Sequence, residues 1–186
     1  MTPSSWLALD LLLRRWDAQT VRDTSAPVET NVLNRIDQAL RLAKDGADSA
    51  PRRIRLAAVV TVAVRRDSSF FVHDGTGGIR VVPVGDVGQA AMESGQVVAI
   101  TGEFGAGPGH ARISEARVRQ LGTVALPGPP RPPAAEVAAG LWHGQWIEVE
   151  GSIRDVLLGR DLAMLLTCDG YHFEAELPIG EGGTGS

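Results

Sequence analysis

The sequence predicts a mainly β protein, with helices at the N-terminus and two barrel-like copies after them. Apolar residues alternate with a period of two in several segments between Ile54 and Gly122, and glycine-rich turns stand at the junctions of these segments. An aspartate-glycine hairpin recurs near the C-terminus. With 186 residues, of which 44% are hydrophobic, the chain has room for one domain or two small ones.

The first fifty or so residues predict two helical pieces. The first has an apolar face of large side chains: Trp6, Leu7, Leu9, Leu13 and Trp16. Asn31 is the expected N-cap of the second and Gly46 its expected end. Its apolar residues recur at helical spacing: Val32, Leu33, Ile36, Leu40 and Ala43.

After Pro51 the period changes to two. Ile54 to Val64 predicts a long, largely buried strand, since apolar residues occupy both of its faces. Two short strands follow, joined through "DGTGG", where glycine supplies the positive φ of a tight hairpin turn. The inward set of this hairpin is expected to be Phe70, Val72, Ile79 and Val81.

Two further strands complete the first copy. They are Gln96 to Phe104 and the segment "HARISEARVRQLG", in which the phase changes and predicts a bulge near Ser114 and Glu115. The connection "DVGQAAMESG" is long enough for about two helical turns. This order predicts a five-stranded Greek-key barrel of the OB type.

A second, incomplete copy follows a proline-rich connector. "WIEVEGSI" predicts a new first strand from Trp146, and Asp169-Gly170 precedes a proline and a glycine at the distances seen after Asp74-Gly75. The copy reaches only a third strand, Tyr171 to Leu177. Either the chain is a fragment of a longer protein or the copy is completed from elsewhere. The predicted segments are helical 1–51, barrel 52–122, connector 123–140, partial copy 141–180 and glycine-rich tail 181–186.

The third strand of the partial copy is an expected site of partner attachment. Without closing strands its edge N–H and C=O groups lack partners, and such an edge is a template for another strand. The residues assigned to this edge pairing are Tyr171, Phe173 and Leu177.

Charge differs between segments. Arg52 to Gly122 carries nine basic and six acidic residues, whereas Thr123 to Ser186 carries three and nine. The longest apolar run, "LAAVVTVAV", is far shorter than the roughly 20 residues of a membrane-spanning helix. No secretion signal is recognised at the N-terminus. One cysteine, Cys168, excludes a disulfide framework within the chain.

Enzyme signatures are missing from the sequence. It contains no nucleophile elbow, no zinc-protease motif and no phosphate loop. The four histidines are scattered singly, so we expect no metal site, no cofactor and no catalytic residue. A non-enzymatic binding role is the prediction.

The ligand face of an OB barrel lies on strands two and three. Phe71, His73 and Arg80 share one phase there and are the predicted ligand-binding residues, offering a ring and a cation. A small ligand or a neighbouring protein domain is the expected partner. The alternative is a single-stranded nucleic acid, which the sparse aromatic residues and the acidic second copy disfavour.

Several segments together resemble a known family. "IRLAAVVTVAV", "FFVHDGTGGIRV", "SGQVVAITGEF", "ARISEARVRQLG" and "WHGQWIEVEGSIRDV" are similar, in this order and spacing, to the tandem OB-like sensor region of bacterial two-component histidine kinases and related exported proteins. The resemblance covers Thr30 to about Ile179. It implies an input or binding module in an extracytoplasmic location, and it implies no catalytic residues.

Overall fold

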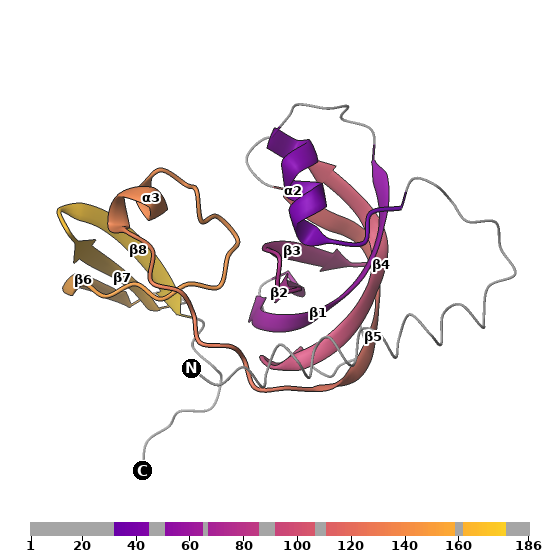
Figure 1. Cartoon of the computed structure of the whole chain (residues 1–186). Coiled ribbons are helices and arrows are strands. Elements are labelled where there is room, and N and C mark those ends of the chain that lie inside the picture. The colour runs from indigo at the N-terminus through magenta and orange to yellow at the C-terminus, as the bar shows by residue number, and fades with distance from the viewer. Residues whose placement is uncertain are drawn as a thin grey trace, which may run out of the picture. The chain divides into compact units, whose positions relative to one another are not determined.

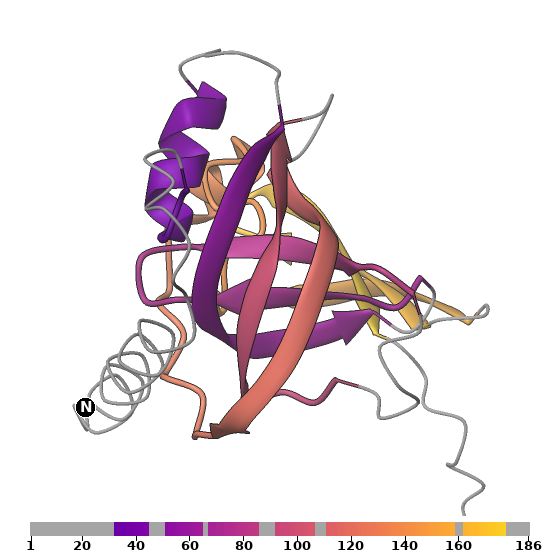
Figure 2. The ribbon, with the colours of Figure 1, turned by 90° about the vertical axis from the view of Figure 1, so that its right-hand side faces the viewer.

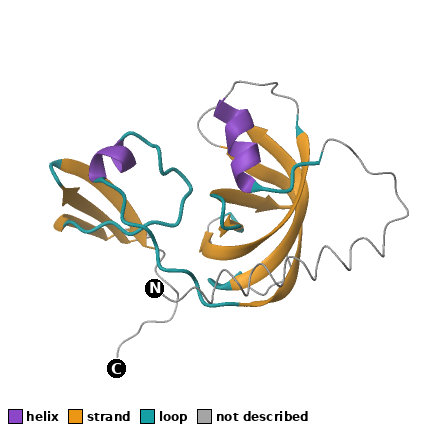
Figure 3. Cartoon of the chain, viewed as in Figure 1, coloured by secondary structure: helices purple, strands orange, loops and turns teal. Residues whose placement is uncertain are grey.

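A computed structural model describes residues 32–44, 51–64, 67–85, 92–106, 111–158 and 162–177. The chain divides into two compact units, each built mainly of strands (Figures 1 and 3). The first unit extends to Gly128 and also includes Gly144–Trp146, and the second holds 129–143 and the chain from Ile147 onward. The apolar face predicted between Trp6 and Trp16 and the predicted cap Asn31 lie outside the described residues, as do Gly46 and 86–91 of the predicted helical connection.

The first unit is a closed five-stranded barrel in the order β1-β2-β3-β5-β4 (Figure 2). β3 and β5 pair in parallel, and the other neighbours are antiparallel. The predicted OB-type fold is therefore confirmed. The strands are β1 (Arg52–Val64), β2 (Ser69–His73), β3 (Gly78–Pro83), β4 (Gln96–Ala106) and β5 (Ala111–Thr123).

β1 is long because it serves two neighbours in turn. Its first part, Arg52–Val59, pairs with β4, and its second part, Val59–Val64, pairs with β2. The bulge expected in β5 is confirmed, since the pairing with β4 shifts register there and Glu115 has a φ of 50°. The side chains that fill the barrel include Leu56, Val60, Phe70, Val81, Ile100 and Ile113.

A second, smaller cluster explains why β1 is buried on both faces. Val59 and Val97 point to the outside of the barrel, yet they are 2% and 0% exposed. They are packed against the chain that leaves β5: Leu121, Val124 and Leu126. The sequence prediction of a largely buried first strand is thus confirmed.

Helix α2 (Ile36–Lys44) closes one end of the barrel core. Ile36 and Ala39 are fully buried within that core. The predicted helical face began earlier, at Val32, and this was wrong for Val32 and Leu33, which precede the helix. The Leu33 N–H donates to the Arg53 carbonyl (3.0 Å), and its carbonyl accepts from the Arg55 N–H (2.8 Å). The first part of β1 is not paired with β2, so its edge can bind Leu33.

The second unit is a three-stranded antiparallel sheet in the order β6-β7-β8, accompanied by a short helix α3 (Ala134–Ala138). The strands are β6 (Ser152–Leu158), β7 (Leu162–Cys168) and β8 (Tyr171–Leu177). The prediction that the first strand starts at Trp146 was wrong. The Glu148 N–H donates to the Pro130 carbonyl (2.9 Å), so this segment contacts the proline-rich connector and does not pair with a strand.

The two aspartate-glycine turns differ in structure. Cys168 pairs with Tyr171, so Asp169-Gly170 is a two-residue turn with φ values of 48° and 84°. This geometry is the tight hairpin that an Asp-Gly pair favours. In the barrel His73 pairs with Gly78, which leaves a longer loop of 74–77. The repeated sequence landmark therefore marks two different turns.

Candidate functional site

The barrel hairpin β2-β3 carries the predicted ligand-binding residues. Phe71 lies directly across from Arg80, as the alternation predicted, and the inward set of this hairpin is buried. The Phe71 side chain is half-buried. The ring and the guanidinium therefore share one side of the hairpin.

Arg80 is held by its neighbours. Its guanidinium forms an ion pair with Asp67 and donates to the Ser69 hydroxyl (3.0 Å). The pKa of Asp67 lies below its ordinary value, because the Ser69 hydroxyl donates to it (2.6 Å) and Arg80 adds its charge. This internal pairing offsets the positive charge that a bound anion would use.

His73 has a local structural partner. Its Nδ1 accepts a hydrogen bond from the Gly75 N–H (3.0 Å). Burial lowers the pKa of His73 and favours the neutral ring, while the charge of Asp74 opposes this shift. The imidazole thus stabilises this turn by accepting the hydrogen bond from Gly75.

Asp74 fixes helix α2 from a distant part of the chain. One carboxylate oxygen accepts from the Ile36 N–H (2.8 Å), and the other accepts from the N–H groups of Thr76 (2.8 Å) and Gly77 (3.2 Å). The Thr76 hydroxyl oxygen accepts from the Asp37 N–H (3.1 Å). The "DGTGG" loop therefore caps the N-terminus of α2, a role that the sequence did not reveal.

A short segment after the connector, Gly144–Trp146, contacts β3. The Gln145 side-chain amide accepts from the Gly78 N–H (2.8 Å) and donates to the Gly78 carbonyl (3.3 Å). Gln145 was not among the predicted site residues. No local pattern marks it, since it lies 67 positions after Gly78.

The second unit presents an apolar sheet face. Directly paired residues lie on the same face of a sheet, so the pairing of β6 with β7 and of β7 with β8 defines this set. None of these described side chains is buried. We call the set the open apolar face, and its members are Ile153, Val156, Met164, Leu166, Cys168, Tyr171, Phe173 and Ala175.

The exposure of this face is largest along β6 and at the start of β8. Ile153 is 56% exposed, Val156 45% and Tyr171 41%. Monomeric proteins seldom leave a contiguous apolar patch of this kind uncovered, and such patches mark interaction sites. Two of the predicted edge residues, Tyr171 and Phe173, lie on this face.

The two edges of the sheet differ. Among the described residues no further strand pairs with β8, which agrees with its predicted role as an edge. At β6 the pairing shifts register between Ile153 and Asp155, and the Asp155 carboxylate accepts from the Val156 N–H (2.8 Å). Bulges and charges of this kind protect an edge against strand addition.

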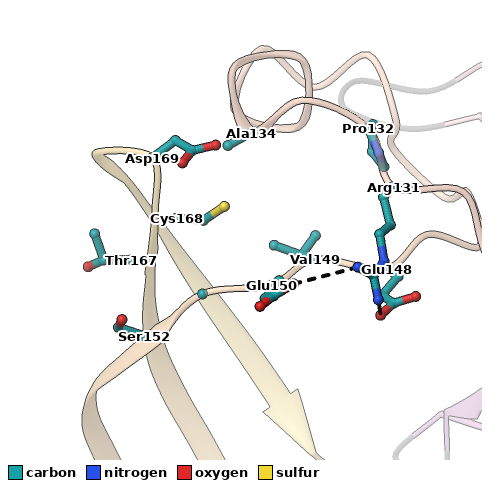
Figure 4. A pocket seen from close by; sticks show the side chains of 11 residues that line it. Arg131, Pro132, Ala134, Glu148, Val149, Glu150, Ser152, Thr167, Cys168 and Asp169 are labelled. Carbon is teal, nitrogen blue, oxygen red and sulfur yellow. Dashed lines mark hydrogen bonds and ion pairs between the residues drawn. The ribbon is translucent and has the colours of Figure 1, made fainter.

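A cleft of about 530 Å³ lies between the connector and this sheet (Figure 4). Cys168 projects toward it, and its lining comes from residues 131, 132, 134, 148–152 and 167–169. Arg131 pairs with Glu148 and with Glu150, and the hydrogen bond with Glu148 raises the pKa of Arg131. The Arg131 guanidinium that lines the cleft is therefore already paired with carboxylates.

Metal and membrane sites were also sought within the part of the chain that the structure describes. Its His, Cys, Asp and Glu side chains form no group of three or more that could hold a metal ion. None of its helices is long and apolar enough to cross a membrane.

Comparisons with known proteins add little to this geometry. No family model and no curated protein matches the chain. A chain of a replication protein A heterotrimer bound to ssDNA is similar, with 22% identity and a TM-score of 0.40 over 50% of this chain and 82% of that one. The hypothetical protein YgiW from E. coli is similar with 14% identity and a TM-score of 0.38, over 48% and 89%. Such low scores carry no argument about function, and the strand order alone establishes the OB-type barrel.

Proposed function

We propose that the protein is a non-enzymatic binding module that attaches a protein partner to the open apolar face of its second unit. The observation that carries the proposal is that this face is only partly covered: none of its members is buried, and three of them are exposed. Ile153, Val156 and Tyr171 are exposed, and the side chains that share this face of the sheet with them are apolar. Burying them in a complex would be favourable by roughly 25 cal/mol per Å² of apolar surface.

The charges around the face indicate the chemistry of the partner. The opposite face and the connector carry carboxylates: Glu148, Glu150, Asp155, Glu174 and Glu176. The basic residues described in this unit are Arg131, which is paired with glutamates, and Arg154. A complementary partner would offer an apolar surface bordered by basic residues.

An input role in signalling agrees with this proposal. The resemblance to the sensor regions of histidine kinases implies a module that binds and does not catalyse. The paired state of Arg80 and Arg131 supports the same view, because neither guanidinium is placed for chemistry on a substrate.

Single-stranded nucleic acid is the second candidate. It is favoured by exposed arginines on β5, Arg112, Arg117 and Arg119. Against it, the stacking platform that such ligands use needs several aromatic side chains along a basic groove, and Phe71 is half-buried.

Retention of a partner from lysate by matched variants tests the proposal. Val156→Lys places a charge on the open apolar face, whereas Leu157→Lys places it on the opposite face of the same strand, where Leu157 is 60% exposed. We expect the Leu157→Lys and unaltered chains to retain one protein that Val156→Lys loses. Retention by all three chains, or by none, would contradict the proposal.

The single cysteine provides a second readout. Cys168 lies on the open apolar face, so partner binding should slow its reaction with a thiol reagent. Sedimentation shows whether the partner is a second copy of the chain. In that case the reaction would slow with rising protein concentration in the absence of any other protein.

A further inference from the structure

The barrel binds a short segment of its own chain, Gly144–Trp146, at the start of β3. The chain passes Gly128 and contributes to the barrel unit again only at Gly144–Trp146. β5 pairs with β3 from Arg80 onward, so the edge of β3 at Gly78 is not occupied by β5. The Gln145 amide satisfies both backbone groups of Gly78 in the way that a neighbouring strand would.

The fit around this contact is close. A Cβ atom on Gly78 would lie 2.2 Å from the Gly144 carbonyl oxygen, so a side chain at Gly78 cannot coexist with the segment. Gly144 has a φ of 73°, which favours glycine, and a Cβ there would lie 3.9 Å from the Phe71 ring. The Trp146 indole N–H donates to the Pro127 carbonyl (3.0 Å).

We propose that the β3 edge at Gly78, with Phe71 and the Pro127 carbonyl, is a peptide-binding site for a Gly-Gln-Trp segment, and that residues 144–146 are its resident ligand. The site selects a carboxamide, because it needs one acceptor and one donor on the same planar group. A glutamate would offer no donor to the Gly78 carbonyl. A substituent on the first residue of the peptide would approach β3 and Phe71.

The resident segment is held in a way that permits exchange. The hydrogen bonds described above are made by the side chains of Gln145 and Trp146, and residues 144–146 form no strand ladder. All three residues are half-buried. Tethering gives the segment an effective concentration on the order of millimolar, so an external peptide competes only when the resident segment is weakened.

This site is separate from the open apolar face. It lies within the barrel unit and recognises hydrogen-bonding groups, whereas the open apolar face belongs to the second unit and is uncharged. A second copy of the chain, or a partner with the same three residues, has the chemistry to occupy the site.

A binding titration with a labelled peptide tests the proposal. The probe is Leu-Trp-His-Gly-Gln-Trp-Ile-Glu, the sequence of residues 141–148. Gln145→Ala removes the resident amide, so we expect this variant to bind the probe at least about tenfold more tightly than the unaltered chain. A probe with glutamate in place of glutamine should not bind.

A substitution in the site provides a matched variant that should lose probe binding. Gly78 is not in the left-handed region, so an alanine suits the backbone of β3, and the nearest atoms to its Cβ belong to the bound segment. Adding Gly78→Ala to Gln145→Ala should abolish probe binding, whereas adding Gly105→Ala should not, because a Cβ at Gly105 meets nothing within 4 Å. Amide protection in β4 and β5 shows that each variant keeps the barrel.

Amide exchange at Gly78 provides an independent measure. Its N–H has the Gln145 oxygen as acceptor, so Gln145→Ala should accelerate exchange at Gly78 by about tenfold while amides in β4 stay protected. Probe binding should restore the protection. Equal probe affinity for the unaltered chain and Gln145→Ala, or binding that survives Gly78→Ala, would overturn the proposal.

Discussion

The strands that open the two sheets, β1 and β6, both contain isoleucine, leucine and valine but differ in burial. In β1, Ile54 is fully buried, and each side chain from Leu56 to Thr61 is buried as well. In β6, Ile153 is 56% exposed, and each described side chain from Ser152 to Leu157 is exposed. The difference arises from the neighbours, since β1 pairs with both β4 and β2, whereas β6 pairs with β7. An apolar strand thus becomes core only when other elements cover it.

The largest expected effect is the loss of a core isoleucine. Ile54→Ala should lower the free energy of unfolding of the barrel by about 2–5 kcal/mol, since it leaves a cavity in a packed core. The matched change Ile153→Ala should cost less than about 1 kcal/mol, because that side chain is more than half exposed. Denaturant unfolding, followed separately in each unit, measures the change in unfolding free energy for both variants. Equal costs would mean that β6 is packed as well as β1.

The two aspartate turns provide the next comparison. Asp74→Ala removes the acceptor for the Ile36 N–H and for the loop, so we expect a loss of about 1–2 kcal/mol in the stability of the barrel. Asp169→Asn should cost less than about 0.5 kcal/mol, because asparagine tolerates the left-handed backbone of that turn. Thermal unfolding measures both, and a smaller cost for Asp74→Ala than for Asp169→Asn would contradict the capping role.

A pH comparison sharpens the account of the barrel loop. Burial holds the pKa of His73 below its ordinary value of 6.5, so the unfolded chain binds a proton first as the pH falls. This contribution to stability is therefore present above the ordinary pKa and is lost as the pH falls from there toward the folded pKa. His73→Asn keeps an acceptor for the Gly75 N–H without titrating, and it should reduce the loss of stability between about pH 7.5 and about pH 5.5. An unchanged pH dependence would contradict this assignment.

The smallest expected effect is on single-stranded DNA. The chain has a net charge of −4, and Arg80 on the β2-β3 hairpin is paired with Asp67. Little counterion release is available to drive association, so we expect no appreciable binding at physiological salt. Fluorescence anisotropy with a labelled oligonucleotide at two salt concentrations measures this. Micromolar binding that weakens steeply with salt would favour nucleic acid over a protein partner.

Local patterns predicted the barrel well. The period-two alternation located β1 to β5, and the change of phase at Ser114 and Glu115 located the bulge, because both depend on neighbours in sequence. The strand predicted from Trp146 was wrong for a non-local reason. Its alternation suits a paired strand, but the segment is hydrogen-bonded to Pro130 in the connector and does not pair with a strand.

The contacts of the candidate sites were less predictable than the fold. The Asp74 cap on Ile36 joins residues that are 38 positions apart, and Gln145 reaches Gly78 across 67. Such pairs need the closed barrel to bring them together. The sequence placed Phe71 across from Arg80, but it could not show that Asp67 pairs with that arginine.

Hydrogen exchange compares the two sheets most directly. If the open apolar face is only partly covered in the isolated chain, amides of β6 to β8 should exchange at least about a hundredfold faster than those of Ile54 to Val60, because local opening exposes little additional apolar surface there. Protection in Ser152 to Leu177 as strong as in β1 would show a finished, self-contained unit. That result would contradict the account of a sheet face that awaits a partner.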